Sequence, residues 1–253
     1  MNVIDYICFN DSAQKASLVT FIKEKINTSN KGYCIVENKL LDASLFMLML
    51  HETLAPSLSL SQKDGVKIPF DVVKDKGEQM GKPGTILSAT NQLFPLHTDC
   101  CFLEKPADFI ALYCVENSDT GGENTLLNIN CVIPLLPHIY LQYLLTTNFL
   151  FYSKEYKILE KTANTFFVRF HQGELMESCP TQKKEKCIAD LQPLLALLED
   201  PVHYTTVKLQ PNQCLIVNNR TCLHGRFAFE AGSKRTFYRL RHYINKIAFP
   251  YLL

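Results

Sequence analysis

The sequence contains no tryptophan and no strong excess of charge of either sign. Its 253 residues include 26 Lys and Arg against 25 Asp and Glu. Proteins that bind nucleic acid by neutralising phosphates carry a clear basic excess, so this balance argues against nucleic acid as a partner. Hydrophobic residues make up 47% of the chain, which argues against intrinsic disorder and is enough for a large core.

Long apolar runs and a secretory leader are also lacking. The most apolar stretch, 131–152, is interrupted by prolines and polar residues, whereas a membrane span needs about 20 mostly apolar residues. The opening MNVIDYICFND has neither the basic nor the apolar region of a signal peptide. The ten cysteines form no CxxC pair and are too sparse for a disulfide scaffold. We therefore predict reduced thiols, a cytoplasmic location and no membrane contact.

Hydrophobic patterning predicts helices near the N-terminus and many short strands in the second half. Helical spacing is found over about 11–27 and 42–55, and again over about 137–145 and 183–198. Runs rich in β-branched and aromatic residues between turn signals predict strands. The expected strands are GYCIVE (32–37), TILSAT (85–90), FIALYCV (109–115), NTLLNI (124–129), NFLFYS (148–153), TFFVRF (165–170), YTTVKL (204–209), QCLIVNN (213–219) and RTFYRLRHYI (235–244).

This pattern predicts a mainly β fold with covering helices, built on an antiparallel jelly-roll barrel. No repeat, low-complexity tract or linker divides the chain, so we expect a single domain over 1–253. It would comprise N-terminal helices over about 11–53 and a barrel core over about 85–245. The polar segment between them, about 56–84, is expected to be a lid or binding loop.

A His-x-Asp sequence, His97-Thr98-Asp99, has the composition of a metal site. On a strand, residues two apart point to the same side, so an imidazole and a carboxylate could face one ion. His224, which follows the apolar run 213–219, is the best candidate for a third ligand. Two histidines and one carboxylate leave three positions open, which is the usual site of non-haem Fe(II) oxygenases. Each feature alone is also common in proteins that bind no metal.

Two further segments carry polar chemistry. In KRTFYRLR (234–241), Arg235, Arg239 and Arg241 share the parity of one strand face, and arginine binds carboxylates through two parallel hydrogen bonds. The alternative is a solvated basic edge strand. In GGENT (121–125), two glycines allow a tight turn and Thr125 offers a hydroxyl, which by itself predicts only a hairpin.

Taken together and in order, these segments resemble a known family. The order is His-x-Asp, then GG-x-x-T, then NRTCLHGR (219–226), then arginines eleven and fifteen residues after His224. The set is similar to the Fe(II)- and 2-oxoglutarate-dependent dioxygenases of the taurine dioxygenase/TfdA and clavaminate synthase-like superfamily. The HGR segment and the stretch 96–129 resemble especially the trimethyllysine and γ-butyrobetaine hydroxylase branch. The resemblance covers about 85–243.

The resemblance implies a double-stranded β-helix, also called a cupin-like jelly roll. It implies Fe(II) held by His97, Asp99 and His224, with 2-oxoglutarate as cosubstrate and O2 as oxidant. Halogenating relatives replace the carboxylate ligand by a small residue, so Asp99 argues against halogenation. The turn before the last ligand strand usually reads Pro-Gly-Asp in the family, and here it is PNQ (211–213).

The resemblance also implies the binding of the organic ligands. Arg235 would pair with the distal carboxylate of 2-oxoglutarate, helped by the hydroxyl of Thr125. Arg239 would lie beside that site, and would contact either 2-oxoglutarate or an anionic group of the substrate. The amides of Asn91 and Gln92 could also hydrogen-bond a polar substrate, although a polar strand start is an equal explanation.

The expected activity is hydroxylation of an unactivated C–H bond in a small polar metabolite such as a free amino acid, with release of succinate and CO2. The partner is therefore a small molecule, and homo-oligomer formation is left open. Desaturation, cyclisation or epimerisation on the same scaffold remains an alternative outcome. A barrel that binds a small molecule without catalysis and a zinc hydrolase remain alternative classes.

Overall fold

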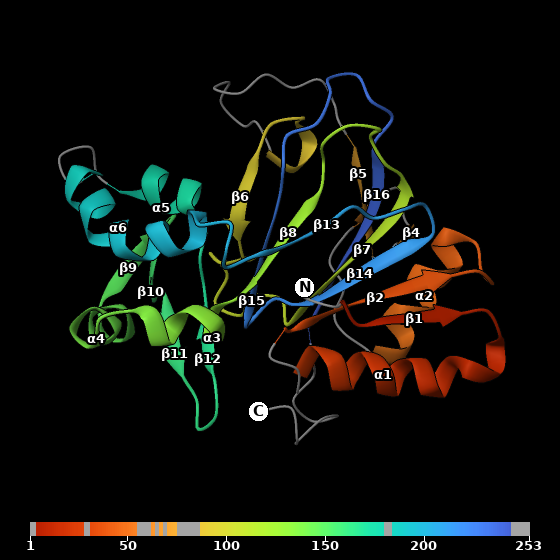
Figure 1. The fold of residues 1–253 in the computed structure, drawn as a ribbon, viewed down its shortest axis with the longest axis horizontal. Helices are drawn as coiled ribbons and strands as arrows, with labels where there is room; N and C mark the ends of the chain where they lie inside the picture. The colour runs from red at the N-terminus through yellow and green to blue at the C-terminus, as the bar shows by residue number, and fades with distance from the viewer. Residues whose placement is uncertain are drawn as a thin grey trace.

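The computed structural model describes residues 4–27, 31–54, 62–63, 66–67, 70–74, 87–179 and 184–243. Two main sheets dominate the described residues (Figure 1). In sheet order, the larger one comprises β1 (Tyr6–Phe9), β2 (Tyr33–Asn38), β14 (Gln213–Asn218), β7 (Phe109–Glu116), β16 (Thr236–His242) and β5 (Phe70–Lys74). The smaller one comprises β13 (Thr205–Val207), β8 (Asn124–Asn128), β15 (Cys222–Arg226) and β6 (Phe94–His97).

Alternating side chains of the larger sheet face two different cores, as β14 shows. Leu215 and Val217 join an apolar cluster with Leu126 and Cys222 of the smaller sheet, so this cluster lies between the two sheets. The neighbouring residues of β14 point to the opposite face and pack under the N-terminal helices. Because successive strand residues point to opposite sides, both faces of this apolar strand are buried.

The N-terminal helices cover the outer face of the larger sheet (Figure 1). The helical segment begins with η1 (Ser12–Gln14), where the side chain of Asp11 accepts a hydrogen bond from the backbone of Ala13. It continues as α1 (Lys15–Asn27), which packs on β2 and β14. The second helix, α2 (Ala43–Leu54), contacts β7 and β16. The predictions of both helices are confirmed.

A second group of elements forms its own apolar cluster beside the smaller sheet, on the left of Figure 1. Buried leucines and phenylalanines of these helices and hairpins contact residues of β6, β8 and β15. The elements are α3 (Ile129–Val132), η3 (Ile133–Leu135), α4 (His138–Thr146), β9 (Asn148–Phe151), β10 (Lys154–Lys157), β11 (Leu159–Lys161), β12 (Phe166–Val168), α5 (Gln172–Ser178) and α6 (Lys184–Glu199).

The prediction of a mainly β core with covering helices is confirmed, but two local predictions are wrong. Within 85–90, the described residues form η2 (Leu87–Ala89) instead of a strand, because both the backbone N–H and the hydroxyl of Thr90 bond to the carbonyl of Leu87 and close a turn. Within the expected loop 56–84, β5 is a strand paired with β16. The same segment contains β3 (Gln62–Lys63) and β4 (Val66–Lys67), and its other residues lie outside the described part.

Among the described residues, no helix combines the length and the apolar character that a membrane crossing requires. No disulfide joins any of the described cysteines.

A pair of histidines under the N-terminal helices, His242 buried and His51 half-buried, leads to a prediction about acid stability. His242 on β16 stacks on Phe109 and lies edge-on to His51 of α2, with 5.7 Å between the two imidazole centroids. Among the described residues, neither ring nitrogen of His242 has a hydrogen-bond partner. Burial, and then the neighbouring His51, lower the pKa of His242 from 6.5 to about 4.

We expect acid to destabilise the protein through His242. Because the unfolded chain takes up a proton near pH 6.5 and the folded chain only near pH 4, the free energy of unfolding falls as the pH is lowered between these values. The loss for this residue is about 3 kcal/mol. Denaturant unfolding of a His242→Phe variant should show a shallower pH dependence than the parent. His138→Phe, at an exposed position of α4, should keep the parental slope, and equal slopes in all three proteins would contradict the assignment.

Candidate metal centre

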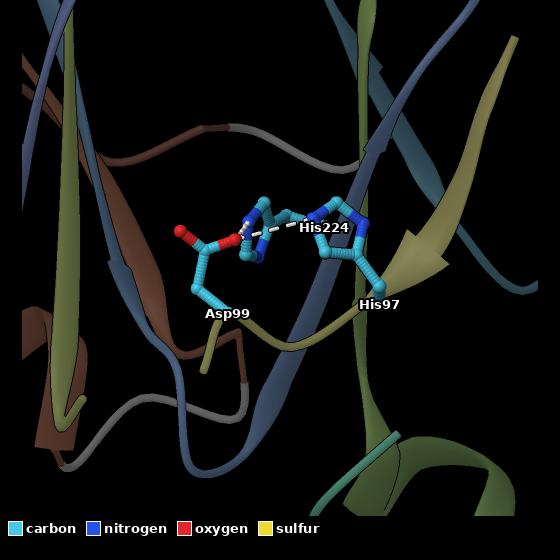
Figure 2. Close-up of side chains that lie close together, drawn as sticks. All are labelled: His97, Asp99 and His224. Carbon is cyan, nitrogen blue, oxygen red and sulfur yellow. Dashed lines mark ion pairs between the residues drawn. The ribbon is translucent and has the colours of Figure 1, made fainter. Parts of the chain in front are cut away.

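Pairing of two strands brings the two predicted histidines together. His97 is the last residue of β6, and His224 lies opposite it in the middle of β15. Asp99 follows in the turn after β6. All three side chains are buried, and one ligand atom from each lies within 4.8 Å of the others. Figure 2 shows the two imidazoles and the carboxylate converging from these separate segments.

The prediction that His97 and Asp99 lie on one continuous strand is wrong, because β6 ends at His97. A turn brings Asp99 back toward the histidines, and the side chain of Asn219 holds that turn. Its amide oxygen accepts from the backbone N–H of Asp99 at 2.8 Å, and its amide nitrogen donates to the carbonyl of Asp99 at 2.9 Å. The next residue, Cys100, has a left-handed backbone with φ of 59°. Asn219 belongs to the segment 219–226, but nothing in the sequence indicated this contact.

The protonation states of His97 and Asp99 suit a metal ligand set. Nδ1 of His97 lies 2.8 Å from the carbonyl of Pro95, so this nitrogen donates and Nε2 keeps its lone pair. Burial, and then the charge of His224, lower the pKa of His97 to about 4. Burial opposes ionisation of Asp99, but the nearby Arg239, with His224, His97 and Arg241, holds the pKa of Asp99 well below its usual range. The site therefore offers a neutral imidazole and an ionised carboxylate at neutral pH.

The placement of these atoms fits a bound cation. Nε2 of His97 lies 3.3 Å from Oδ1 of Asp99, and Nε2 of His224 lies 3.5 Å from the same oxygen. Nε2 of His97 is buried, and no described residue forms a hydrogen bond with it. A lone pair that faces a carboxylate oxygen is unfavourable unless a proton or a cation lies between them. Two imidazoles and one carboxylate are the donor set that Fe(II) oxygenases use.

Aromatic rings restrict the His97 imidazole on two sides. Phe94 stacks on it with centroids 3.8 Å apart, and His171 lies edge-on at 5.3 Å. Burial, followed by the charge of His97, lowers the pKa of His171 to about 4, so this second ring is also neutral at pH 7. His171 caps α5 by accepting from the backbone of Glu174, and it also borders the metal centre.

Arg235 is buried and lies next to aromatic rings. Its guanidinium stands 4.0 Å from the ring centroid of Phe237 and 5.4 Å from that of Phe229. No carboxylate among the described residues pairs with it, and its Nε has no hydrogen-bond partner. Burial, and then the charge of Arg226, lower the pKa of Arg235 to about 9. A buried guanidinium beside another one requires an anion, so this region fits an anionic ligand.

Glycines make room for both candidate ligand regions. Gly122 has φ of 74°, and a Cβ at that position would lie 2.7 Å from Oγ of Ser118 and 3.5 Å from Nε of Arg235. Gly225 follows His224 and pairs with Thr125 on β8. A Cβ on Gly225 would lie 2.7 Å from the Thr125 hydroxyl, so this approach of the strands excludes a side chain. Thr125 is itself buried at this approach of the strands.

Arg239 and Arg241 reach the metal centre from β16. Nε of Arg241 donates to Oδ2 of Asp99 at 2.6 Å, and Nη1 of Arg239 lies 3.6 Å from the same oxygen. Both arginines also pair with Asp71 of β5, which lies opposite Arg239 in the strand register. The expected shared face therefore holds for these two arginines. Arg235 precedes the first residue of β16 and lies over the rings of Phe229 and Phe237. Asp71 lies in the segment 56–84, which was expected to be a loop. The sequence therefore did not predict its ion pairs with the two arginines.

The structure places Asn91 and Gln92 in hydrogen bonds within the protein. The side chain of Asn91 donates to the carbonyl of Phe229 at 3.3 Å, and Gln92 is exposed and donates to Asn91 at 3.0 Å. A cavity of about 300 Å³ borders His97, and neither amide lines it. It is mainly apolar and is lined by Leu87, Leu93, Phe94, Pro95, Leu96, His97, His171, Gln172, Gly173 and Met176.

The unusual turn before β14 has a structural explanation. Asn212 occupies the position where related sequences carry glycine, and its φ is 70°. Asparagine tolerates this left-handed conformation better than most residues. Its side-chain oxygen also accepts a hydrogen bond from the hydroxyl of Tyr113 at 3.1 Å. The substitution therefore preserves the turn.

Comparisons with known proteins agree with this arrangement. The sequence profile of the taurine catabolism dioxygenase TauD, TfdA family matches residues 58–241. No curated protein sequence matches the chain.

Three solved structures illustrate the similarity of the fold. Asparagine oxygenase in complex with Fe(II), 2S,3S-3-hydroxyasparagine and succinate has a TM-score of 0.69 at 17% identity, over 90% of this chain and 79% of the other. The oxygenase OrfP in complex with Fe, succinate and (3S)-hydroxy-L-Arg has a TM-score of 0.71 at 10% identity, over 92% and 82%. PvcB, an Fe, α-ketoglutarate dependent oxygenase, has a TM-score of 0.61 at 18% identity, over 91% and 80%. The predicted double-stranded β-helix is confirmed.

We expect divalent metal to bind at the three converging side chains. His224→Ala and Asp99→Ala should each weaken Co(II) binding by more than about 100-fold, because loss of an outer-shell partner alone typically costs 10–100-fold. Anaerobic calorimetric titration measures the change. His203→Ala, in the turn before β13, serves as the control and should bind Co(II) as the parent does. Parental affinity in both site variants would exclude this metal centre.

Proposed function

This chain belongs to the taurine catabolism dioxygenase TauD, TfdA family, and on that premise we propose that it hydroxylates an unactivated C–H bond of a free amino acid or a similar small polar metabolite. It is a 2-oxoglutarate-dependent non-haem iron oxygenase. Its cofactor is Fe(II), its cosubstrates are 2-oxoglutarate and O2, and succinate and CO2 are the coproducts. The asparagine oxygenase and OrfP complexes contain hydroxylated amino acids beside succinate, which supports the proposed substrate class.

The observation that carries the metal assignment is the convergence of three buried ligand atoms within 4.8 Å. In our proposal, His97, Asp99 and His224 hold Fe(II). The iron and 2-oxoglutarate together supply the activation of O2 through oxidative decarboxylation of the cosubstrate. The protein orients the ligands: the carbonyl of Pro95 fixes the tautomer of His97, and Asn219 fixes the backbone of Asp99.

The unpaired charge of Arg235 supports binding of the distal carboxylate of 2-oxoglutarate. A planar guanidinium makes two parallel hydrogen bonds with a carboxylate, and a buried anion would also offset the repulsion from Arg226. We propose that the hydroxyl of Thr125 assists this contact. With its distal end fixed, 2-oxoglutarate would be held in one orientation.

The apolar cavity beside His97 supports a substrate with an uncharged part near the metal. About 300 Å³ of space bordered by leucines, Phe94 and Met176 suits aliphatic carbon and excludes an unpaired charge. Arg239 is the proposed partner for an anionic group, either of the substrate or of 2-oxoglutarate. Contacts of Asn91 and Gln92 with the substrate remain predictions, and would require their present hydrogen bonds to be exchanged.

The branch of the family, the extent of the domain and the cellular location are also proposals. We infer the trimethyllysine and γ-butyrobetaine hydroxylase branch only from the segments 96–129 and 219–226. A single domain over 1–253 is inferred from the absence of a linker in the sequence. Cysteines that are too sparse for a disulfide scaffold and form no CxxC pair favour a reducing compartment, which is why we propose a cytoplasmic location.

Two measurements test the proposed reaction. Mixing the protein with Fe(II) and 2-oxoglutarate without oxygen should produce a visible charge-transfer absorption band. Adding O2 with a panel of free amino acids should then release succinate and add the mass of one oxygen to the substrate. Loss of two hydrogens would instead show desaturation, and a band without turnover would favour a silent binding barrel. Activity that does not need O2 would favour a zinc hydrolase.

We expect Arg235→Lys to weaken 2-oxoglutarate binding by about tenfold or more, since an ammonium cannot form the two-pronged pair. Titration of the anaerobic absorption band with 2-oxoglutarate measures this affinity. Arg226→Lys is the matched control, because Arg226 is equally buried but donates to the carbonyls of Thr90 and Gln92. Equal losses in the two variants would refute the special role of Arg235.

A further inference from the structure

The two carboxylate oxygens of Asp99 have different partners. Oδ1 faces Nε2 of His97 at 3.3 Å and Nε2 of His224 at 3.5 Å. Oδ2 points away from both imidazoles, as Figure 2 shows, and meets the arginines of β16. One oxygen is therefore directed to the metal centre, and the other is occupied on its outer side.

Arg241 makes the shortest contact with that outer oxygen. Its Nε donates to Oδ2 of Asp99 at 2.6 Å, which is the length of a strong charge-assisted hydrogen bond. Arg239 comes only within 3.6 Å of the same oxygen, and makes its own hydrogen bond to Asp71 at 3.3 Å. Arg239 thus adds positive charge, whereas Arg241 adds a directed bond.

A second carboxylate holds the guanidinium of Arg241 from its far side. Nη1 of Arg241 donates to Oδ2 of Asp71 at 2.6 Å. Asp71 is positioned by the pairing of β5 with β16, and its side chain is partly exposed while that of Asp99 is buried. The rigid guanidinium therefore spans from an edge strand to the metal centre, with a different nitrogen bonded to each carboxylate.

We propose that Arg241 is a positioning residue that keeps Asp99 a one-oxygen ligand, and that Asp71 fixes Arg241 for this role. The proposal rests on the proposed Fe(II) site. Two histidines and one single carboxylate oxygen would leave three positions of a bound Fe(II) open for 2-oxoglutarate and O2. If both oxygens of Asp99 bound the metal, one of these positions would be lost. The bond from Arg241 makes Oδ2 unavailable to the metal.

Co(II) titration without 2-oxoglutarate tests this role apart from catalysis. The parent, Arg241→Met, Arg241→Lys and Asp71→Asn proteins are titrated anaerobically, and the visible d–d absorption of Co(II) reports the coordination as well as the affinity. Arg220→Lys is the matched control, because Arg220 is half-buried and its side chain pairs with Glu160 at 3.8 Å, outside the metal centre.

We expect Arg241→Met to bind Co(II) 10–100-fold more weakly and with an altered absorption spectrum. Arg241→Lys keeps the positive charge but cannot bond to both carboxylates from two fixed nitrogens, so it should bind at least threefold more weakly. Asp71→Asn should change the affinity in the same direction as Arg241→Lys, and Arg220→Lys should match the parent. If Arg241→Met does not fold, Arg241→Lys decides the test.

Parental affinity and spectrum in the Arg241 variants would overturn the positioning role and leave the metal centre intact. The positioning role would also be overturned if Arg220→Lys changed the affinity and spectrum as much as Arg241→Lys does. If the parent bound Co(II) no better than His224→Ala, the metal assignment itself would fail, and the role of Arg241 with it.

Discussion

The structure depends on one buried negative charge, the carboxylate of Asp99. An ionised carboxylate out of contact with water is costly unless positive groups compensate it. Arg241 and Arg239 supply that compensation on the outer side, and the two histidines face it on the inner side. This requirement connects four segments of the chain. The charge is compensated only when the strands pair in the correct register, and these strands are β6 with its turn, β15, β16 and β5.

A buried positive charge without a counterion complements it. Arg235 lies among aromatic rings and beside Arg226, and in the described residues no carboxylate pairs with it. Side chains of the protein therefore compensate the charge of Asp99, whereas the charge of Arg235 has no counterion among the described residues. A dicarboxylate such as 2-oxoglutarate fits this asymmetry, because one end can bind a metal while the other neutralises the guanidinium. The uncompensated charge of Arg235 both lowers the stability of this region and gives it affinity for an anion.

Sequence reasoning identified the three side chains that converge in the structure and missed those that hold them in place. His97, Asp99 and His224 could be found from residue type and order, because few residue types bind Fe(II). The turn at Asp99 and the hydrogen bonds from Asn219 that hold it could not be found from the sequence. Both depend on contacts between residues 120 positions apart in the chain. β5 was hidden within a polar segment because only its pairing with β16 makes it a strand. The short run near Leu87 looked like a strand, but local hydrogen bonds to its carbonyl closed a turn instead.

The ion pairs of Asp71 with Arg239 and Arg241 make β5, at the edge of the larger sheet, part of the metal centre. No side chain of β5 is fully buried, and the carboxylate of Asp71 is partly exposed. Exposed ion pairs contribute little to stability on their own. Here, however, the partner guanidinium is also bonded to a buried carboxylate, so the two bonds of Arg241 are coupled through one rigid group. The placement of β5 therefore affects the orientation of Asp99 more than it affects the stability of the fold, and a strand at the sheet edge helps to set the geometry at the centre of the barrel.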